Sequence, residues 1–212
     1  MTESTSHLRQ LPRGRHRLSR EEVVASQRER ILVAMGEAMT EGGYVGTPVA
    51  AILKRAGVSR ETFYEQFRSK EECFEAAFDR ASGLLAARLQ EVSIDPSEPP
   101  LDRLDHILEA YLRHLVDDPA AARLYLVEVF AVGPAAIAER MALLERFVDV
   151  LATVLGASTP EQRFACEMLA SGIGGMVTGR IAAEDLSGLL ALREPILELA
   201  RRSGALFGTA LT

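Results

Sequence analysis

Apolar residues recur every three or four positions along most of the chain, which is the spacing of a buried helix face. In the first such segment Ile31, Met35, Ala38 and Met39 share one face. Alternating runs of β-branched residues, which would predict strands, are nearly absent. The pattern therefore predicts an all-α fold. The expected helices cover residues 21–41, 48–56, 59–67, 69–91, 101–117, 120–130, 134–155, 160–182 and 188–207.

A proline-rich and acidic stretch, I-D-P-S-E-P-P at residues 94–100, is the clearest linker in the chain. Together with the helix pattern it predicts three parts. Residues 1–19 are expected to form a flexible basic arm, residues 20–85 a small helical domain, and residues 86–212 a larger helical domain.

The second and third expected helices have the signature of a helix-turn-helix. Thr47 is expected to be the N-cap of the second helix, with Pro48 at its first helical position. Gly57 breaks the chain, Val58 is apolar enough to fill the angle between the two helices, and Ser59 can cap the third.

Two more local signals mark the neighbouring helices. The glycine pair at residues 42 and 43 is expected to end the first helix. Ser69 and Glu72 match a capping box, with the serine at the N-cap of the long fourth helix.

Charge is distributed unevenly along the 212 residues, whose formal net charge is −6. Residues 1–70 hold 12 lysines and arginines against 8 acidic residues, whereas residues 71–212 hold 12 against 22. A basic end on an acidic body suggests that only the N-terminal part meets a polyanion.

Hydropathy and cysteine content indicate a cytosolic protein. The first twenty residues are polar and basic, and no run approaches eighteen apolar residues. Cys73 and Cys166 lie in apolar helical patterns far apart in sequence, so buried free thiols are favoured over a disulfide or a nucleophile.

The third expected helix separates into a buried and an exposed side. Phe63 and Phe67 are four residues apart and share one face, which is expected to pack with Val58 against the first two helices. Glu61 and Glu65 point most directly away from that face.

The remaining exposed positions of this helix are candidates for reading DNA. Arg60, Thr62 and Tyr64 lie on its flanks or at its N-terminal end, which enters the major groove in a helix-turn-helix. Arg60 and Tyr64 are the first choices for base contacts. Glu61 and Glu65 either accept a hydrogen bond from cytosine N4, or they pair with Arg60 and Arg68 or simply stay hydrated.

Three residues at helix starts are candidates for phosphate contacts. A hydroxyl, an unpaired N–H group or an ammonium at such a position can hold a phosphate. These residues are Thr47, Ser59 and Lys70.

The basic arm contains Pro-Arg-Gly-Arg-His-Arg, which is similar to the core of an AT-hook. Arg13, Arg15 and Arg17 would then enter a narrow A·T-rich minor groove. The alternative is a solvated tail that adds non-specific attraction to DNA.

Three segments in this order resemble the DNA-binding domain of the TetR family of bacterial transcriptional regulators. They are R-E-R-I-L, E-G-G-Y-V-G-T-P-V-A-A-I and A-G-V-S-R-E-T-F-Y-E-Q-F-R-S-K-E-E, within residues 25–85. The resemblance implies a helix-turn-helix over about 48–67. It also implies DNA contacts at positions already chosen on physical grounds: Thr47, Ser59, Arg60, Tyr64 and Lys70.

Two features depart from the family pattern. Leu53 stands where the family usually has a small residue, so the crossing of the second and third helices is expected to be slightly altered. Glu61 and Glu65 place two carboxylates where they would repel phosphates.

The larger domain carries no catalytic motif, and its histidines lack metal-ligand spacing, so neither an enzyme nor a metal or other cofactor is expected. Ser171, Gly175 and Gly179 recur at i, i+4 and i+8, which lets another backbone approach closely. Packing within the chain is the alternative reason for these small residues. Because the TetR family dimerises through its last two long helices, the resemblance implies an interface on residues 160–182 and 188–207, including Leu190.

A pocket for a small-molecule effector is expected in the same domain, lined by aromatic and isolated polar residues. Most of the aromatic residues fit a core position equally well, and Glu128 fits a structural carboxylate paired with Arg123. The candidates are Tyr111, His114, Tyr125, Glu128, Phe147, Cys166, Met168 and Met176.

The sequence thus predicts a homodimeric, ligand-responsive regulator that binds a palindromic DNA operator, most simply as a repressor released by an unknown small molecule. The alternatives are an activator, a DNA-binding protein without an effector, and a partner-binding module that has lost DNA binding.

Overall fold

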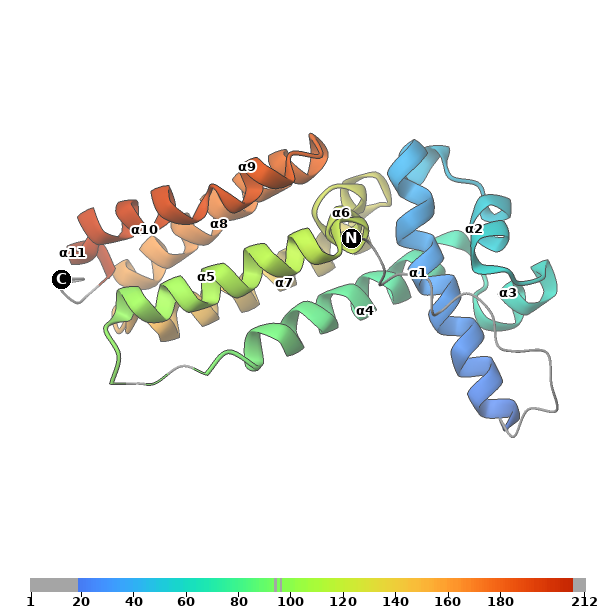
Figure 1. Cartoon of the computed structure of the whole chain (residues 1–212), viewed down its shortest axis with the longest axis horizontal. Helices are drawn as coiled ribbons and strands as arrows, with labels where there is room; N and C mark the ends of the chain where they lie inside the picture. Colours follow the sequence, from blue (N-terminus) through green and yellow to red (C-terminus); the bar gives the residue numbers. More distant parts are fainter. Residues whose placement is uncertain (1–18, 94, 96, 208–212) are drawn as a thin grey trace. The chain divides into compact units, whose positions relative to one another are not determined.

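The computed structural model describes residues 19–93, 95 and 97–207, and all regular structure within these residues is helical. The all-α prediction is confirmed. The helices, labelled in Figure 1, are α1 (Arg20–Gly46), α2 (Val49–Ala56), α3 (Arg60–Gln66), α4 (Lys70–Gln90), α5 (Pro100–Asp117), α6 (Pro119–Leu126), the 3-10 helix η1 (Glu128–Ala131), α7 (Pro134–Leu155), α8 (Pro160–Ala182), α9 (Leu186–Leu190), α10 (Arg193–Arg202) and α11 (Gly204–Phe207).

The chain divides into two compact units, with the boundary between Arg80 and Ala81. This boundary falls inside α4, which runs without a break from Lys70 to Gln90. Gly83 lies in the interior of that helix and is exposed. The predicted arm, with Arg13, Arg15 and Arg17, lies outside the described residues.

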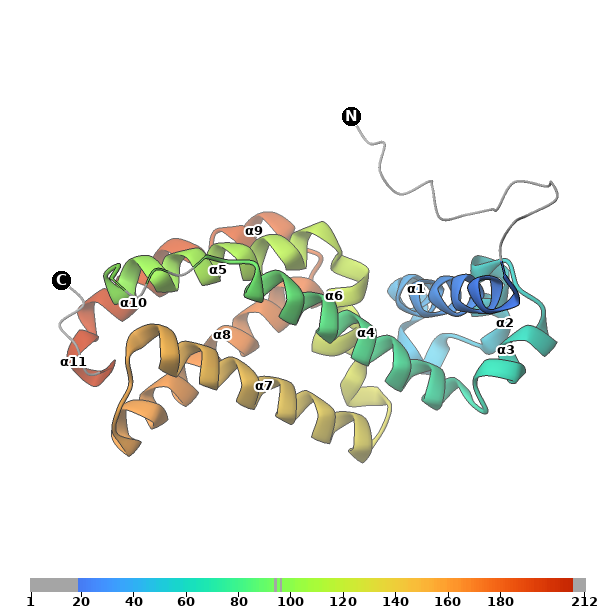
Figure 2. The same cartoon turned by 90° about the horizontal axis from the view of Figure 1, so that it is seen from below.

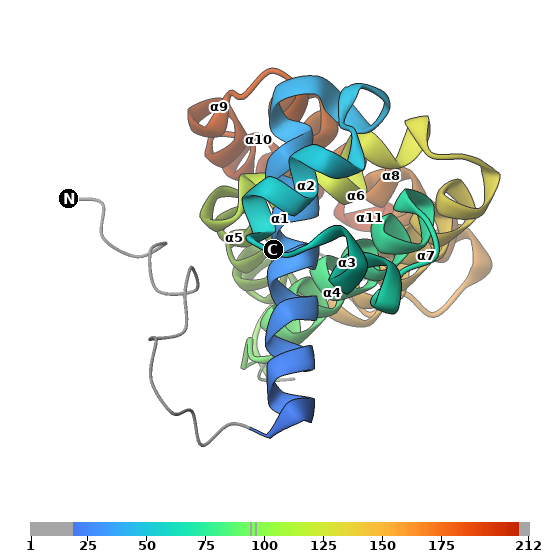
Figure 3. The same ribbon diagram turned by 90° about the vertical axis from the view of Figure 1, so that its right-hand side faces the viewer.

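In the first unit, α1 supplies the central hydrophobic face, and α2 and α3 pack on it (Figure 3). Ser19 caps α1 in a capping box: its hydroxyl accepts from the Glu22 N–H at 3.2 Å, and its own N–H donates to the Glu22 carboxylate. The predicted face is buried, with Ile31, Met35 and Met39 fully inaccessible to solvent. Helical periodicity therefore identified the core side of α1 correctly.

The end of α1 differs from the prediction. Gly43 interrupts the helix with φ 65° and ψ −179°, as a glycine permits, but a further helical turn continues to Gly46. The glycine pair therefore kinks the helix where it was expected to end it.

Thr47 was expected to cap α2, and this prediction is wrong. Thr47 follows the end of α1, and the residue before α2 is Pro48, which makes no side-chain cap. The Thr47 hydroxyl donates to the carbonyl oxygens of Gly43 at 2.7 Å and Ala38 at 3.2 Å, and the residue is only 3% exposed. Thr47 thus closes the turn after α1.

The turn between α2 and α3 has the predicted construction. Gly57 adopts the left-handed conformation (φ 65°, ψ 39°), and the N–H groups of Gly57 and Val58 both donate to the Leu53 carbonyl. Arg30 of α1 donates to the Ala56 carbonyl at 2.9 Å. Because these bonds satisfy the last carbonyls of α2, they fix the direction in which α3 begins.

Both predicted serine caps are present. The Ser59 hydroxyl accepts from the Thr62 N–H at 3.0 Å, and the Ser69 hydroxyl accepts from the Glu72 N–H at 3.1 Å. The Glu72 carboxylate returns to the N–H of Arg68, so the reciprocal bond of the box lies one residue earlier than predicted.

The second unit consists of the C-terminal part of α4 and the helices α5 to α11. In this unit α7 packs along α8, and α6 also contacts α8 (Figure 2). α5 contacts α7 on one side and α9 and α10 on the other. The segments predicted as single helices over 120–130 and 188–207 are divided, the first into α6 and η1 and the second into α9, α10 and α11.

Cys73 and Cys166 are buried free thiols, as predicted. Burial raises the pKa of the Cys73 thiol to about 12. Within the described ranges no helix has the length and apolar character needed to span a bilayer.

Candidate DNA-binding surface and ligand cavity

One side of α3 anchors the helix to the first unit. Phe63 and Phe67 are fully buried, with ring centroids 5.5 Å apart. The Arg28 guanidinium lies 4.4 Å from the Phe67 ring centroid and donates to the Gln66 carbonyl at 3.5 Å. The buried pair was predicted from its four-residue spacing, whereas the arginine that covers it was not.

The opposite side of α3 is open to solvent. Arg60, Glu61, Tyr64 and Glu65 are exposed, and Thr62 is half-buried. The Arg60 guanidinium lies 5.3 Å from the Tyr64 ring centroid, so these two side chains form one cation–π unit at the N-terminal part of the helix. The structure thus brings together the two residues expected to read base edges.

The two carboxylates share this exposed surface with Arg60 and Tyr64. Neither Glu61 nor Glu65 forms an ion pair with another residue of the described chain. Ion pairs with Arg60 and Arg68 are absent among the described residues, and both carboxylates are exposed, which leaves them available to accept a hydrogen bond from a base or to stay hydrated.

The residues predicted to hold phosphates differ in their accessibility. Ser59 is exposed, and its hydroxyl lies 2.9 Å from that of Thr62. The Thr47 hydroxyl is buried and already bonded to two carbonyls.

Lys70 is half-buried and contacts the end of α1. Its ammonium donates to the carbonyl oxygens of Tyr44 at 2.8 Å and Thr47 at 3.1 Å, and it lies 4.0 Å from the Tyr44 ring centroid. Burial lowers the pKa of Lys70. Since an ammonium has three hydrogens, one remains for a phosphate.

The second unit contains a cavity of about 430 Å³ that is partly open to solvent and has a mostly apolar lining. α4 contributes Leu85 and Leu89, and the other walls come from α5, α6, α7 and α8. Its size and character are those of a small-molecule site.

Three of the eight predicted ligand residues line this cavity: Tyr111, Tyr125 and Phe147. The rings of Tyr111 and Phe147 lie 5.1 Å apart. The other five predicted residues lie outside the lining, namely His114, Glu128, Cys166, Met168 and Met176. Glu128 is buried and accepts from Arg123 Nε at 2.9 Å, which is the structural ion pair weighed as its alternative role.

Among the lining residues that were not predicted from the sequence are Arg140 and Gly174. A signal for Arg140 was present. It stands four residues after buried Ala136 and seven before Phe147, so an arginine occupies the apolar face of an amphipathic helix.

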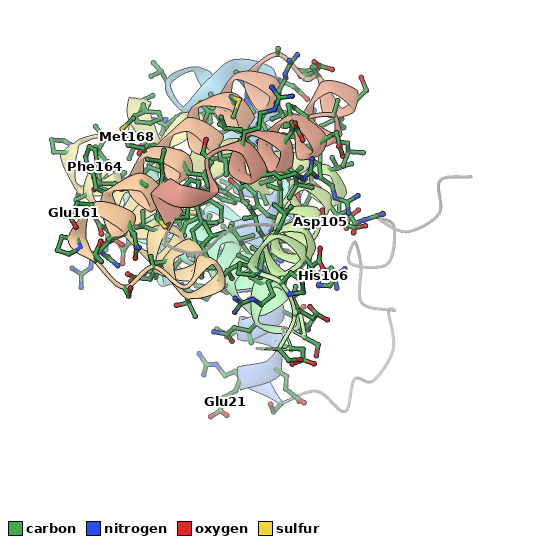
Figure 4. The ribbon with its side chains drawn as sticks, turned by 90° about the vertical axis from the view of Figure 1, so that its left-hand side faces the viewer. Glu21, Asp105, His106, Glu161, Phe164 and Met168 are labelled. Carbon is green, nitrogen blue, oxygen red and sulfur yellow. The ribbon has the colours of Figure 1, made fainter. Side chains whose placement is uncertain are left out.

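The outer face of α8 carries large apolar side chains in contact with solvent. Phe164 is 61% exposed and Met168 63% exposed, and Figure 4 shows both projecting from the same side of the helix. Ser171, Gly175 and Gly179 continue this exposed side. Single exposed apolar residues are common on protein surfaces, whereas these two lie four residues apart on one side of the same helix.

No steric crowding within the described chain explains why glycine occupies these positions of α8. A Cβ placed on Gly175 or Gly179 would meet no atom within 4 Å. Packing inside the chain therefore does not explain them. Leu190, assigned from sequence to the same interface, is also exposed.

The first unit presents the second helix of a helix-turn-helix to solvent, and the second unit contains an apolar cavity. This combination is typical of helix-turn-helix transcriptional regulators. A sequence profile of this class, described as "Bacterial regulatory proteins, tetR family", matches residues 31–77. The match covers the helix-turn-helix region, and together with the relatives below it supports a TetR-family transcriptional regulator.

Among characterised relatives, the chain is 24% identical over 158 residues to the HTH-type transcriptional activator FasR of Mycolicibacterium smegmatis. The match covers 74% of this chain and 70% of FasR. It is 27% identical over 130 residues to the HTH-type transcriptional regulator RutR of Escherichia coli, covering 61% of this chain and 60% of RutR.

Solved structures show the same fold. A TetR-like regulator from Rhodococcus sp. RHA1 superposes with a TM-score of 0.67 at 22% identity, covering 88% of this chain and all of the other. FadR of Bacillus subtilis, solved in complex with stearoyl-CoA, gives a TM-score of 0.69 at 22% identity, covering 81% and 96%.

Proposed function

We propose that this TetR-family protein is a homodimeric regulator that leaves its DNA operator when a small molecule occupies the cavity of the second unit. The observation that carries the proposal is that α4 belongs to both units, because one part of the helix packs in the first unit and the other part lines the cavity of the second. Phe74 and Phe78 are buried in the first unit, whereas Leu85 and Leu89 line the cavity in the second. A ligand that displaces the cavity end of this helix biases the DNA-binding end between two positions.

DNA is proposed to bind the exposed side of α3. Arg60 and Tyr64 would meet base edges in the major groove, because the N-terminal part of the second helix enters the groove in this motif. Ser59 would contact a phosphate and fix the register. We place this activity in the cytoplasm, where bacterial DNA lies.

Dimerisation is proposed to use the outer face of α8 together with α10. Exposed Phe164 and Met168 supply apolar area, and Gly175 and Gly179 permit close approach of a second backbone. A two-fold dimer can present its two α3 helices to successive major grooves about 34 Å apart, which requires a palindromic operator.

A ligand in the cavity is supported by its volume and lining, and the related fold of FadR was solved with stearoyl-CoA. Repression with ligand release is the mode proposed here. Activation is the second candidate, because FasR is an activator.

The test combines DNA selection with measurement of mass. The protein is incubated with a random-sequence DNA pool, and bound DNA is sequenced while sedimentation gives the mass of the complex. An inverted repeat bound by an even number of chains is expected. Selection of single half-sites by a monomer, or of no DNA, contradicts the proposal.

A further inference from the structure

Arg140 of α7 places a charged side chain in the apolar wall of the cavity. Its Nε is buried and has no hydrogen-bond partner among the described residues. The guanidinium reaches toward α8, since a Cβ on Gly174 would lie 3.4 Å from Arg140 Nη2. Gly174 also lines the cavity, so the glycine leaves room beside the guanidinium group.

The other titratable groups of the lining leave this charge uncompensated. Of the described residues around the cavity, Asp149 carries the single carboxylate, and that group accepts from Arg163 at 2.7 Å. Arg146 adds a second, more exposed cation to the lining. Burial raises the pKa of Tyr111 to about 12 even though the charge of Arg140 lowers it, so this phenol remains neutral.

An arginine stays protonated at every pH at which proteins normally fold. Placing a cation in an apolar wall without an anion costs free energy, and a bound anion removes that cost. The planar guanidinium matches the two oxygens of a carboxylate, which it binds through two parallel hydrogen bonds.

Building on the proposed function, we infer that the effector is an apolar molecule bearing one carboxylate, and that Arg140 binds that carboxylate. The apolar part would fill the space between Leu85, Leu89 and Phe147. A monoanion fits better than a phosphate dianion, because Arg140 is the less exposed of the two lining arginines and most of the lining around the cavity is apolar.

A second arginine provides a matched control for this assignment. Arg103 of α5 also has a buried Nε without a hydrogen-bond partner among the described residues, but it is not part of the cavity lining. Arg103→Met therefore removes a comparable cation from the same unit and leaves the cavity unchanged.

The experiment compares acids with their neutral primary amides. Binding of decanoate, decanamide, 4-butylbenzoate and 4-butylbenzamide to the full-length protein is measured by titration calorimetry. We expect each acid to bind at least about tenfold more tightly than its amide, since charge-assisted hydrogen bonds are the stronger kind. Arg140→Met should abolish this preference, Arg140→Lys should reduce it, and Arg103→Met should retain it.

The inference is overturned if neither acid binds, if the amides bind as tightly as the acids, or if Arg140→Met keeps the preference. Binding of stearoyl-CoA that is unaffected by Arg140→Met, with no binding of free acids, also overturns it. Circular dichroism shows whether each variant is folded. Arg140→Lys keeps the comparison decisive if Arg140→Met fails to fold.

Operator release is measured separately, so that the two proposals can fail independently. Acid binding that depends on Arg140 but leaves DNA affinity unchanged supports the assigned ligand class and contradicts ligand-released regulation. Equal release by acids and amides contradicts the assigned class and leaves the proposed regulation intact.

Discussion

The ammonium of Lys70 lies 2.8 Å from the carbonyl oxygen of Tyr44 and 4.0 Å from the centroid of the same residue's ring. The first residue of α4 is thereby tied to the last turn of α1. A position expected from sequence to touch DNA thus also has a structural role within the first unit.

Lys70→Met should reduce both stability and DNA affinity. We expect a loss of about 1–3 kcal/mol in the free energy of unfolding, because two carbonyls lose a charged donor. DNA affinity should fall without a change in preferred sequence, since phosphate contacts carry no base information. Urea denaturation and binding to several operator variants check the two effects.

Lys54→Met is the control, because Lys54 is exposed on α2. Unchanged stability of Lys70→Met, with weaker DNA binding, would show that the ammonium acts on DNA alone.

Arg60→Ala and Tyr64→Ala should each weaken operator binding while the protein remains dimeric. The stacking of the guanidinium on the ring predicts that the two losses are not additive. A double-mutant cycle of DNA affinities, with sedimentation to check the dimer, measures this. Additive losses would mean that the two side chains act separately, and unchanged affinities would remove both from the interface.

Glu61→Gln and Glu65→Gln should change which bases are preferred. An exposed carboxylate on α3 can accept from cytosine N4, whereas a glutamine amide also suits adenine. Discrimination of about 1–3 kcal/mol at one base position is expected to shift. Selection from random DNA reads this out directly. A uniform gain in affinity with the same preferred sequence would show that the carboxylates only repel phosphates.

Gly175→Gln should produce a folded monomer with an operator affinity at least about tenfold weaker, because a side chain there obstructs the second chain. Within the described chain the added Cβ has free space. Gly83→Gln is the matched control: Gly83 is another exposed helical glycine with free space around it. Sedimentation equilibrium distinguishes the two. A dimeric Gly175→Gln protein would place the interface elsewhere.

Local sequence signals were enough to predict most of the first unit. The left-handed Gly57 and the Ser59 cap depend on backbone chemistry within a few residues, and both are present. The prediction that Thr47 caps α2 was wrong because its hydroxyl has a distant partner. It donates to the carbonyl of Ala38, nine residues earlier, across a turn that the local sequence pattern does not specify.

The ligand residues show a different limit of sequence reasoning. Periodicity tells which side chains share a helix face, but not what that face meets. Tyr111 and Phe147 line the cavity, whereas Met168, which is equally apolar, lies on the outer face of α8. The place of Arg140 on the apolar face of α7 could be read from the sequence, but that pattern alone does not show whether the face meets a cavity or the core.

The continuity of α4 has a mechanical consequence. Gly83 is three residues beyond the boundary between the units. A Cβ at this position would meet no atom within 4 Å, so packing does not explain the glycine. A glycine inside a helix costs roughly 1 kcal/mol relative to alanine. Gly83 therefore makes α4 easier to bend close to the boundary between the units. Under the proposed regulation, the bending stiffness of the helix at this residue would limit how much of a ligand-induced displacement reaches the first unit.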